Sequence, residues 1–441
     1  MTKKNRLRLA LAAVIAVGLA FHGGCSNNEE SSTRRNEVAQ YSGEVASAWF
    51  KLFNTIVKSE KISPPVASRA YGYCGVALYE SVVPGMEATH RSLMGQLNSL
   101  GGLPAPSNAA YHWPSVANTA LATIARDLFA EASVENRATI DALEQSFIDQ
   151  FKPQAGQTVF DRSAAYGAAV GTAVYAWAFS DGYVTLNNCP FTPPTGPGRW
   201  APTPPAFGPP LQPCWGELRP FVLSNSGECA PPPPPPYDEN HQSPFFQQAV
   251  EVYTTVKSLT ADQNAIALFW ADNPGVTPTP PGHWVAILSQ LVDSNQYKLD
   301  VAAEAYARLG IAEADAFISC WRAKYIYNLV RPITCVRLLI DPNFSPVIAT
   351  PPFPEYTSGH SVQSAASAQV LTDMLGHFPF VDHTHDADGL NSRSFSDFFD
   401  AAQEAQISRL YAGIHYRAAI ADGNVQGICI GMKVSALQFH R

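Results

Sequence analysis

Charge is scarce in this sequence of 441 residues. Only 15% of the residues are charged, whereas 46% are hydrophobic and 11% are aromatic. Disordered chains and tails that coat nucleic acid need more charge and less apolar surface, so both classes are excluded. Basic residues are fewer than acidic ones, with 29 Lys and Arg against 37 Asp and Glu. The resulting net charge of −8 repels DNA, RNA and anionic lipid unless a few bases gather in one pocket, and we expect no nucleic-acid partner.

Long hydrophobic runs are also lacking. Four bases near the N-terminus precede a mostly apolar run at 9–21, which is too short to span a bilayer, and no other stretch is a better candidate. Residues 1–24 are therefore predicted to be a signal peptide. Two glycines precede Cys25, as in bacterial lipoprotein processing sites. This pattern predicts lipidation of Cys25 and a periplasmic or outer-membrane-attached protein, with ordinary cleavage nearby as the alternative.

None of the eight cysteines has the C-x-x-C spacing of common zinc sites, so a zinc site is not expected. Seven cysteines follow Cys25, and an exported chain can oxidise them. Cys189, Cys214 and Cys229 lie in irregular sequence, where a disulfide would most restrict the chain. The odd number leaves at least one thiol free.

Alternating strand patterns are scarce, and helical periodicity dominates. Residues 190–236 break it with 17 of the 36 prolines, a density that no helix or central strand survives. We predict an all-α protein made of two helical halves. Its parts are a polar tether at 25–39, an N-terminal helical half at 40–185, a proline-rich crossover at 186–240 and a C-terminal helical bundle at 241–441.

Bases that interrupt the acidic pattern occur in three short pieces of the C-terminal half. The first holds Lys324 and Arg331, seven residues apart, with Pro332 next. This spacing predicts one helix that carries both bases on one face and ends at Pro332. The residues between them are largely apolar or aromatic, which favours a buried face over a solvated basic stripe. A buried Lys or Arg needs an anion.

The other two pieces can complete an anion site. Ser358 can cap a helix whose first amides point at a ligand, and Gly359 lets an oxyanion approach the backbone. His360 follows directly, and the third piece holds Arg409 and His415. Each piece alone has a plain structural interpretation, a helix cap or a core histidine. Together they predict a cage for a tetrahedral or trigonal-bipyramidal oxyanion such as phosphate or vanadate.

This order of motifs, Lys-x6-Arg-Pro, Ser-Gly-His and Ser-Arg-x5-His, resembles the superfamily of vanadium-dependent haloperoxidases and type-2 phosphatidic-acid phosphatases. Stretches such as Pro64–Tyr71, Trp200–Phe207 and Pro281–Trp284 make the chain similar to the bacterial haloperoxidase branch over roughly 40–437. The resemblance implies two four-helix bundles joined by the proline-rich crossover. It also implies a peroxide-dependent oxidation of halide to a hypohalous-acid-level species, which then reacts with a small organic nucleophile.

The resemblance implies a role for each motif residue. His415 would bind the vanadium of a vanadate cofactor, whose place phosphate can take. Lys324, Arg331 and Arg409 would neutralise its oxygens, with hydrogen bonds from Ser358 and the Gly359 amide. His360 would act as acid–base, and Lys324 would further polarise the bound peroxide. The aromatic positions Trp321 and Phe353 would form the halide pocket without fixing which halide is preferred.

Two residues depart from the family pattern. Thr357 replaces the usual proline before Ser-Gly-His. Ala419 stands where an Asp normally lies four residues after the ligand histidine, and Asp422 or a backbone carbonyl could substitute. Two alternative functions therefore stay open. One is a phosphatase in which His415 forms a phosphohistidine and His360 protonates the leaving oxygen, and the other is a non-catalytic oxyanion-binding lipoprotein.

Two further groups of acids and histidines have competing interpretations. The stretch Asp382–Gly389 contains a His-x-His with flanking acids, which suggests a metal cluster, but its spacing favours a solvated polar loop. Asp272 and His283 could line the site entrance, but Asp272-Asn-Pro-Gly is typical of a turn and His283 of a helix start. We favour the turn.

Overall fold

The computed structural model describes residues 37–441, so the predicted signal peptide, Cys25 and most of the predicted tether lie outside the described residues. The described part is built from α-helices and one two-stranded sheet, which confirms the all-α class. The first helices are α1 (Glu44–Ser59), α2 (Pro64–Val82), α3 (Trp113–Leu128), α4 (Val134–Ala155), α5 (Gln157–Phe179) and α6 (Tyr183–Leu186). Within 37–441, no helix is long and apolar enough to cross a membrane.

The helices after the crossover form the second half. They are α7 (Pro244–Lys257), α8 (Ala261–Phe269), α9 (Thr279–Ser294), α10 (Leu299–Tyr327), α11 (Pro332–Leu339), α12 (Gly359–Leu375), α13 (Phe398–Tyr411) and α14 (Arg417–Ser435). Strands β1 (Phe380–Asp382) and β2 (Arg393–Phe395) pair antiparallel between α12 and α13. The sheet holds Asp382 at a fixed place beside the core.

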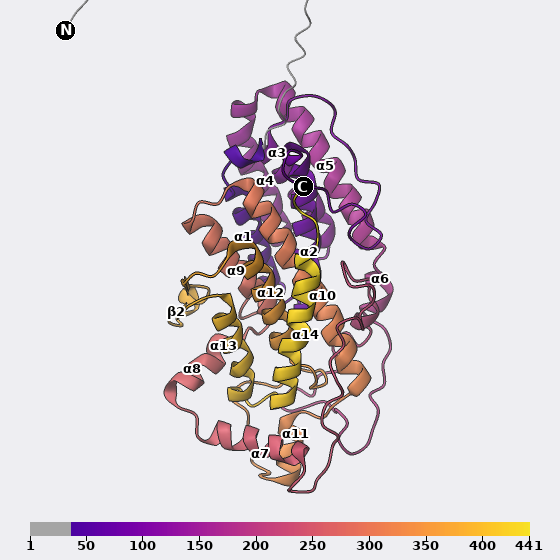
Figure 1. Cartoon of the computed structure of the whole chain (residues 1–441), viewed down its shortest axis with the longest axis vertical. Helices are drawn as coiled ribbons and strands as arrows, with labels where there is room; N and C mark the ends of the chain where they lie inside the picture. The colour runs from indigo at the N-terminus through magenta and orange to yellow at the C-terminus, as the bar shows by residue number, and fades with distance from the viewer. Residues whose placement is uncertain (1–36) are drawn as a thin grey trace, which may run out of the picture. The chain divides into compact units, whose positions relative to one another are not determined.

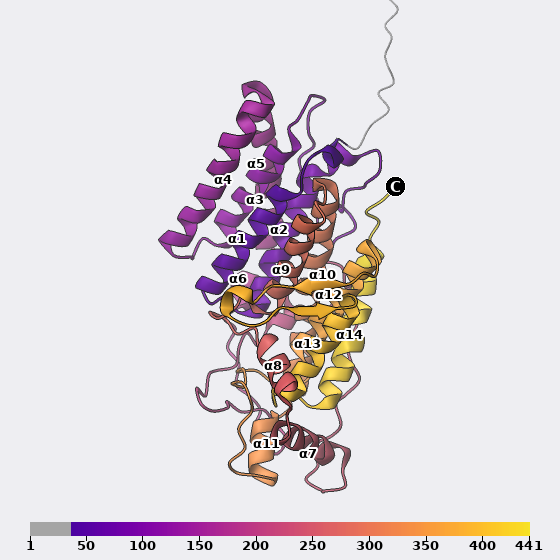
Figure 2. The same ribbon diagram turned by 90° about the vertical axis from the view of Figure 1, so that its left-hand side faces the viewer.

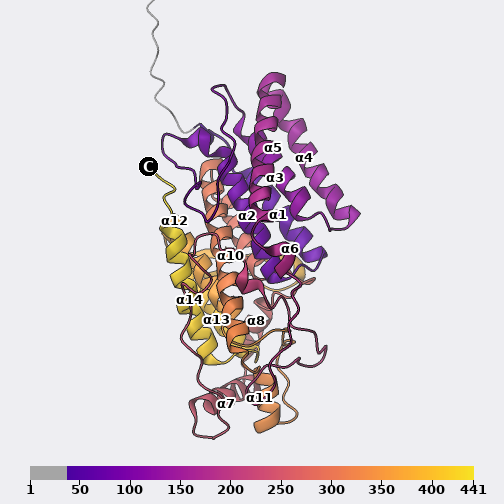
Figure 3. The same ribbon diagram turned by 90° about the vertical axis from the view of Figure 1, so that its right-hand side faces the viewer.

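Helix α10 lies at the centre and joins the two groups. It packs against α2 on one side and α12 on the other, while α12 packs against α13 and α14. Figure 1 shows the whole chain with its helices labelled. In the two side views, α1–α5 lie on one side of α10 and α12–α14 on the other (Figures 2 and 3). Glycine permits the close approach of α2 to α10, because a Cβ at Gly75 would lie 2.5 Å from the Tyr306 carbonyl oxygen.

The proline-rich stretch packs onto this helical body. Within residues 190–236, the only helical turn is the 3-10 helix η3 (Trp215–Glu217), and Trp200, Trp215 and Phe221 are buried. The buried Asp315 carboxylate of α10 accepts hydrogen bonds from three successive amides, those of Phe221, Val222 and Leu223.

Two disulfides restrict the same stretch. Cys189 pairs with Cys214, and Cys229 pairs with Cys429 of α14. Cys74, Cys320 and Cys335 are buried free thiols. The crossover is therefore a fixed structural layer that reaches the C-terminal helices.

Candidate active site

A cavity of about 120 Å³ lies where α10, α12 and the loops before α9, α12 and α14 meet. Six of the predicted site residues line it: Trp321, Phe353, Gly359, His360, Arg409 and His415. The other three, Lys324, Arg331 and Ser358, are fully buried directly behind this lining. The structure thus brings together all nine residues that the three sequence pieces contributed.

Lys324 and Arg331 do not lie on one helix, and that prediction is wrong. Helix α10 ends at Tyr327, and Asn328 then adopts a left-handed conformation with φ 47°. Arg331 is the N-cap of the next helix, and Pro332 begins that helix rather than ending α10. The two bases become neighbours because the chain reverses between them, and proline is well suited to a first helical position.

Lys324 fixes the backbone that precedes Ser358. Its ammonium donates hydrogen bonds to the carbonyl oxygens of Pro354 at 3.1 Å, Glu355 at 3.1 Å and Thr357 at 2.5 Å. It also lies 5.0 Å from the centre of the Phe353 ring. Burial, together with the charge of Arg331, lowers the pKa of Lys324 to about 8.

Arg331 connects the two ends of the cage. Its guanidinium donates to the carbonyls of Phe353 at 2.8 Å and Ile414 at 3.0 Å, and it lies 3.2 Å from Nε2 of His415. The remaining nitrogen, Nη2, is buried and has no hydrogen-bond partner among the described residues. A buried guanidinium N–H without a partner is costly, so this atom suits a bound anion.

Glu355 orients His415, and it is not among the residues that the sequence motifs predicted for the site. Its Oε1 lies 2.8 Å from Nδ1 of His415 and accepts a second hydrogen bond from the Tyr416 amide. The missing carboxylate at Ala419 is thus supplied by Glu355, whereas Asp422 accepts a hydrogen bond from Tyr356 instead. A signal existed, because this acid lies within the same short piece as Ser358.

The histidine is held as a neutral imidazole. Burial and the charges of Arg331 and Lys324 keep the pKa of His415 well below its ordinary value. With Nδ1 donating to Glu355, Nε2 carries the lone pair and faces the cationic side of the cage. Burial raises the pKa of Glu355 to about 7, with Arg331 acting in the opposite sense.

The N-terminus of α12 forms one wall of the cavity. Ser358 caps the helix, as predicted, because its hydroxyl accepts a hydrogen bond from the Ser361 amide. Gly359 is the first residue of the helix, where amides lack an intrahelical acceptor. A Cβ at Gly359 would find no atom closer than 3.7 Å, so the glycine leaves open space at the cavity.

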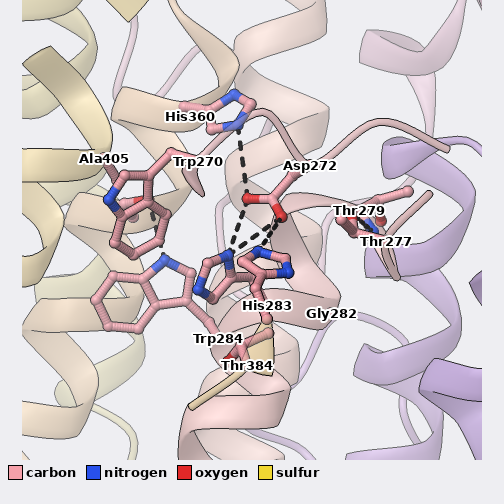
Figure 4. Close-up of polar contacts among 12 residues, drawn as sticks. Trp270, Asp272, Thr277, Thr279, Gly282, His283, Trp284, His360, Thr384 and Ala405 are labelled. Atoms are coloured by element: carbon pink, nitrogen blue, oxygen red, sulfur yellow. Dashed lines mark hydrogen bonds and ion pairs between the residues drawn. The ribbon is translucent and has the colours of Figure 1, made fainter. Parts of the chain in front are cut away.

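His360 and Arg409 lie on the opposite side, next to Asp272. Arg409 donates to the carbonyl of Trp270, and burial lowers its pKa to about 10. Nε2 of His360 is buried, lies 3.9 Å from the Asp272 carboxylate and has no hydrogen-bond partner in residues 37–441 (Figure 4). Burial and the charge of Arg409 keep the pKa of His360 well below its ordinary value.

Asp272 is more than a turn residue, which corrects the interpretation that we favoured. It is buried, lines the cavity and lies 3.0 Å from Nδ1 of His283 (Figure 4). Burial alone would raise the pKa of Asp272, but the charge and hydrogen bond of His283, together with the nearby His385, hold this pKa well below its ordinary value. Conversely, Asp272 and Asp382 outweigh burial and raise the pKa of His283 to about 10.

The stretch Asp382–Gly389 is also misjudged as a solvated loop. Asp382 and His385 are buried, whereas His383 and Asp386 are exposed as expected. The sheet turns alternate residues of the loop inward, where Asp382 meets Nε2 of His283 at 2.8 Å. Sequence alone could not reveal this because the partner residues lie about one hundred positions away.

The residues present fit a vanadate-sized oxyanion. The cavity carries a neutral imidazole nitrogen, three buried cations beside or in its lining, an uncapped helix amide and two buried nitrogens without partners. Such a set of charges and donors is suited to a compact anion with several oxygens. Glu355 contacts His415 at the ring nitrogen that faces away from the cationic side, and the Asp272 carboxylate lines the cavity next to His360.

Comparison with known proteins agrees with this geometry. The family described as the VCPO second helical-bundle domain matches residues 304–343 and 338–440. A solved bacterial vanadium-dependent iodoperoxidase is 37% identical, with a TM-score of 0.84 over 91% of this chain and 97% of that one. No curated protein sequence matches.

The fold is also similar to that of a bacterial vanadium-dependent chloroperoxidase. Its apo form is 13% identical with a TM-score of 0.65, and the match covers 85% of this chain and 94% of that one. Its holo form is 14% identical with a TM-score of 0.66, and the match covers 90% and 96%.

Proposed function

The chain belongs to the family of vanadium-dependent haloperoxidases, and on that premise we propose that it oxidises halide with hydrogen peroxide to a hypohalous-acid-level halogenating species. The observation that carries this proposal is the pairing of His415 with Glu355 inside a buried cationic cage. Peroxide, halide and one proton give hypohalous acid and water, so the site must bind two small reactants and deliver a proton.

We propose that vanadate is the cofactor and that phosphate competes for the same site. His415 would bind it through Nε2, since Nδ1 is occupied by Glu355. When bound, the V(V) centre supplies Lewis acidity that activates hydrogen peroxide without changing oxidation state. Arg331 would donate from its unpartnered Nη2, and the Gly359 amide would donate from the first turn of α12.

Lys324 supplies positive charge to the cage and holds a backbone segment in place, but its N–H groups are already engaged in hydrogen bonds. Its three hydrogen bonds to backbone carbonyls hold the segment from Pro354 to Thr357, which carries Glu355 and leads into the Ser358 cap. The ammonium therefore raises the positive potential of the cage while it fixes the loop that orients His415. Loss of Lys324 would disturb both functions.

His360 is the proposed proton carrier. Its Nε2 is buried at the cavity without a partner, so it is available to hold or deliver a proton to a bound reactant. The Asp272 carboxylate lies 3.9 Å from this nitrogen and raises the pKa of His360, whereas the charge of Arg409 lowers it. The side chain can thus exchange a proton in a site that otherwise disfavours positive charge.

Iodide is the proposed halide, because the 37%-identical relative is an iodoperoxidase. Trp321 and Phe353 line the cavity and pack with their ring centres 4.9 Å apart and their planes tilted by 51°. A large, weakly hydrated anion such as iodide loses its water beside these aromatic rings at a lower free-energy cost than chloride does. The oxidised halogen would then react with a small organic nucleophile.

The test uses the purified full chain incubated with orthovanadate. We expect peroxide-dependent oxidation of iodide, with slower turnover of bromide, and none without vanadate. His360→Ala and His415→Ala should each reduce iodide oxidation at least 100-fold, whereas His377→Ala, at a histidine with a 65% exposed side chain, should leave it unchanged. Bromide or chloride turnover faster than iodide turnover would overturn the halide assignment.

Two other outcomes would overturn the peroxidase assignment. Hydrolysis of a phosphate monoester without vanadate, together with no halide oxidation, would identify a phosphohistidine phosphatase. Vanadate binding without either activity would identify an oxyanion-binding protein.

We also propose that the enzyme is exported and carries a lipid at Cys25. Two disulfides, Cys189–Cys214 and Cys229–Cys429, support an oxidising compartment. Mass spectrometry of the mature N-terminus should find a diacylglyceryl cysteine, and Cys25→Ser should release the protein from the membrane fraction. An unmodified N-terminus beyond residue 25 would contradict the lipid anchor.

A further inference from the structure

We infer that Asp272, His283 and His385 form a binding site for one divalent transition-metal ion, with Zn²⁺ as the expected occupant. One ligand atom from each residue lies within 4.8 Å of the others, and all three side chains are buried. The site shares Asp272 with the wall of the active-site cavity but does not include His415, which faces the cationic cage. The haloperoxidase proposal needs no metal ion at this cluster.

The spacing of the donor atoms suits a tetrahedral ion. The Asp272 carboxylate lies 3.0 Å from Nδ1 of His283 and 3.4 Å from Nε2 of His385. Bonds of about 2.0–2.2 Å to Zn²⁺ would place neighbouring ligands roughly 3.3–3.5 Å apart. Small rotations of the side chains would therefore accommodate the ion. Nε2 of His385 is buried and has no hydrogen-bond partner among the described residues, so this nitrogen is available to bind the ion.

The outer nitrogens of both rings face carboxylates. Nε2 of His283 lies 2.8 Å from Asp382, and Nδ1 of His385 lies 3.3 Å from Asp388. Histidines that bind a metal usually donate their other N–H to such a partner, which fixes the ring and its tautomer. Both predicted ligand histidines have this arrangement, although their acids come from different parts of the loop.

Hydrogen-bond accounting also favours an ion. Both nitrogens of His283 lie within hydrogen-bond distance of a carboxylate, and Nδ1 of His385 lies 3.3 Å from Asp388. Among the described residues, Nε2 of His385 is therefore the nitrogen of the pair that no hydrogen bond satisfies, although it is buried 3.4 Å from Asp272. An ion between the inner nitrogens and Asp272 would satisfy this nitrogen and leave the outer nitrogens to face Asp382 and Asp388.

Aromatic packing holds the rings in place. Trp270 stacks on His283 at 4.3 Å, and Phe269 contacts His385 edge-on at 5.0 Å. The other cluster of this type, around Glu304, differs because Arg308 already occupies its carboxylate and the His440 side chain is 61% exposed. Of the two clusters found within residues 37–441, the one at Asp272 alone combines burial, an unpartnered ligand nitrogen and outer carboxylates.

The test measures metal content and affinity on the full chain, with any tag removed. After dialysis against a chelator, titration with Zn²⁺ followed by calorimetry and elemental analysis should give one bound ion per chain. His385→Ala should weaken Zn²⁺ binding at least 100-fold, whereas His383→Ala, two residues away and exposed, should not change it. His415→Ala should also retain Zn²⁺, which separates this site from the vanadate site.

A milder variant covers the case in which His385→Ala fails to fold. Asp388→Asn keeps all three ligands and should weaken Zn²⁺ binding about 10–100-fold through the outer contact alone. Binding of Mg²⁺ instead of Zn²⁺ would contradict the nitrogen-rich ligand set. Folded wild-type protein that binds no Zn²⁺, or a folded His385→Ala variant that binds it equally well, would overturn the inference and leave a purely hydrogen-bonded cluster.

Discussion

Oε1 of Glu355 lies 2.8 Å from Nδ1 of His415 across sixty residues of sequence, and the same oxygen receives the amide of Tyr416. This contact sets the orientation of the imidazole before any ligand binds. Glu355 acts through His415, so it is a positioning residue rather than a catalytic one.

Glu355→Ala should weaken vanadate binding about 10–100-fold, because the ring loses the partner that selects its tautomer. Glu355→Gln should recover part of this loss, since its amide oxygen still accepts a hydrogen bond. Titration with orthovanadate, read as the concentration that gives half-maximal iodide oxidation, measures the effect. Asp422→Asn is the matched control, because Asp422 contacts Tyr356 instead. Equal affinities for Glu355→Ala and the control would contradict the positioning role.

Asn328 should be replaceable by glycine but not by a β-branched residue. It ends α10 with φ 47° and ψ 42°, a left-handed conformation that glycine adopts freely. We expect Asn328→Val to lower the free energy of unfolding by about 1–2 kcal/mol and Asn328→Gly to change it by less than about 1 kcal/mol. Denaturant unfolding measures both. Because this residue reverses the chain between Lys324 and Arg331, the valine variant should also bind vanadate more weakly.

Gly427 of α14 should not tolerate alanine. A Cβ there would lie 2.1 Å from the Val362 carbonyl oxygen of α12, so the two helices would have to separate. Overpacking of this kind costs about 1–3 kcal/mol of unfolding free energy. Gly101→Ala is the control, since nothing lies within 4 Å of its added Cβ. A thermal midpoint that is equal in both variants would show that α12 and α14 adjust without strain.

The buried Glu80 should make the protein less stable at high pH. It accepts hydrogen bonds from the Ser92 hydroxyl and the Leu93 amide, yet burial raises its pKa to about 7. The folded state therefore holds this proton more tightly than the unfolded chain does. The resulting stability is present below about pH 4.5 and disappears as the pH rises through about 7.

As the pH rises from 5 to 8, ionisation of Glu80 should lower the free energy of unfolding of the wild-type protein by about 2 kcal/mol. Glu80→Gln should reduce that loss, while Glu131→Gln, at an exposed acid, should leave it unchanged. Urea unfolding at both pH values gives the comparison. A Glu80→Gln variant with the same pH dependence as wild type would show that other groups are responsible.

Much of the fold follows from local pattern. The spacing of apolar residues predicts a helix over 359–375, and α12 has these bounds because Ser358 caps it and small apolar residues continue its periodicity. The same spacing predicts a helix over 295–330, whereas α10 spans only Leu299–Tyr327. Periodicity continues through 328–331, but a left-handed residue followed by Arg331-Pro332 ends one helix and begins another. Helix boundaries of this kind depend on backbone conformation, which hydrophobic spacing does not report.

The three motifs of the C-terminal half predict nine residues that the fold brings to one cavity, because each motif places cations, imidazoles or helix-cap residues at short spacing. The contacts that support these residues depend on how the helices pack. Glu355 contacts His415, and Asp272 contacts His283. None of the three motifs contains either pair. Ionic and hydrogen-bonded contacts act over a few ångströms in space, so their partners are fixed by how helices pack and not by spacing along the chain.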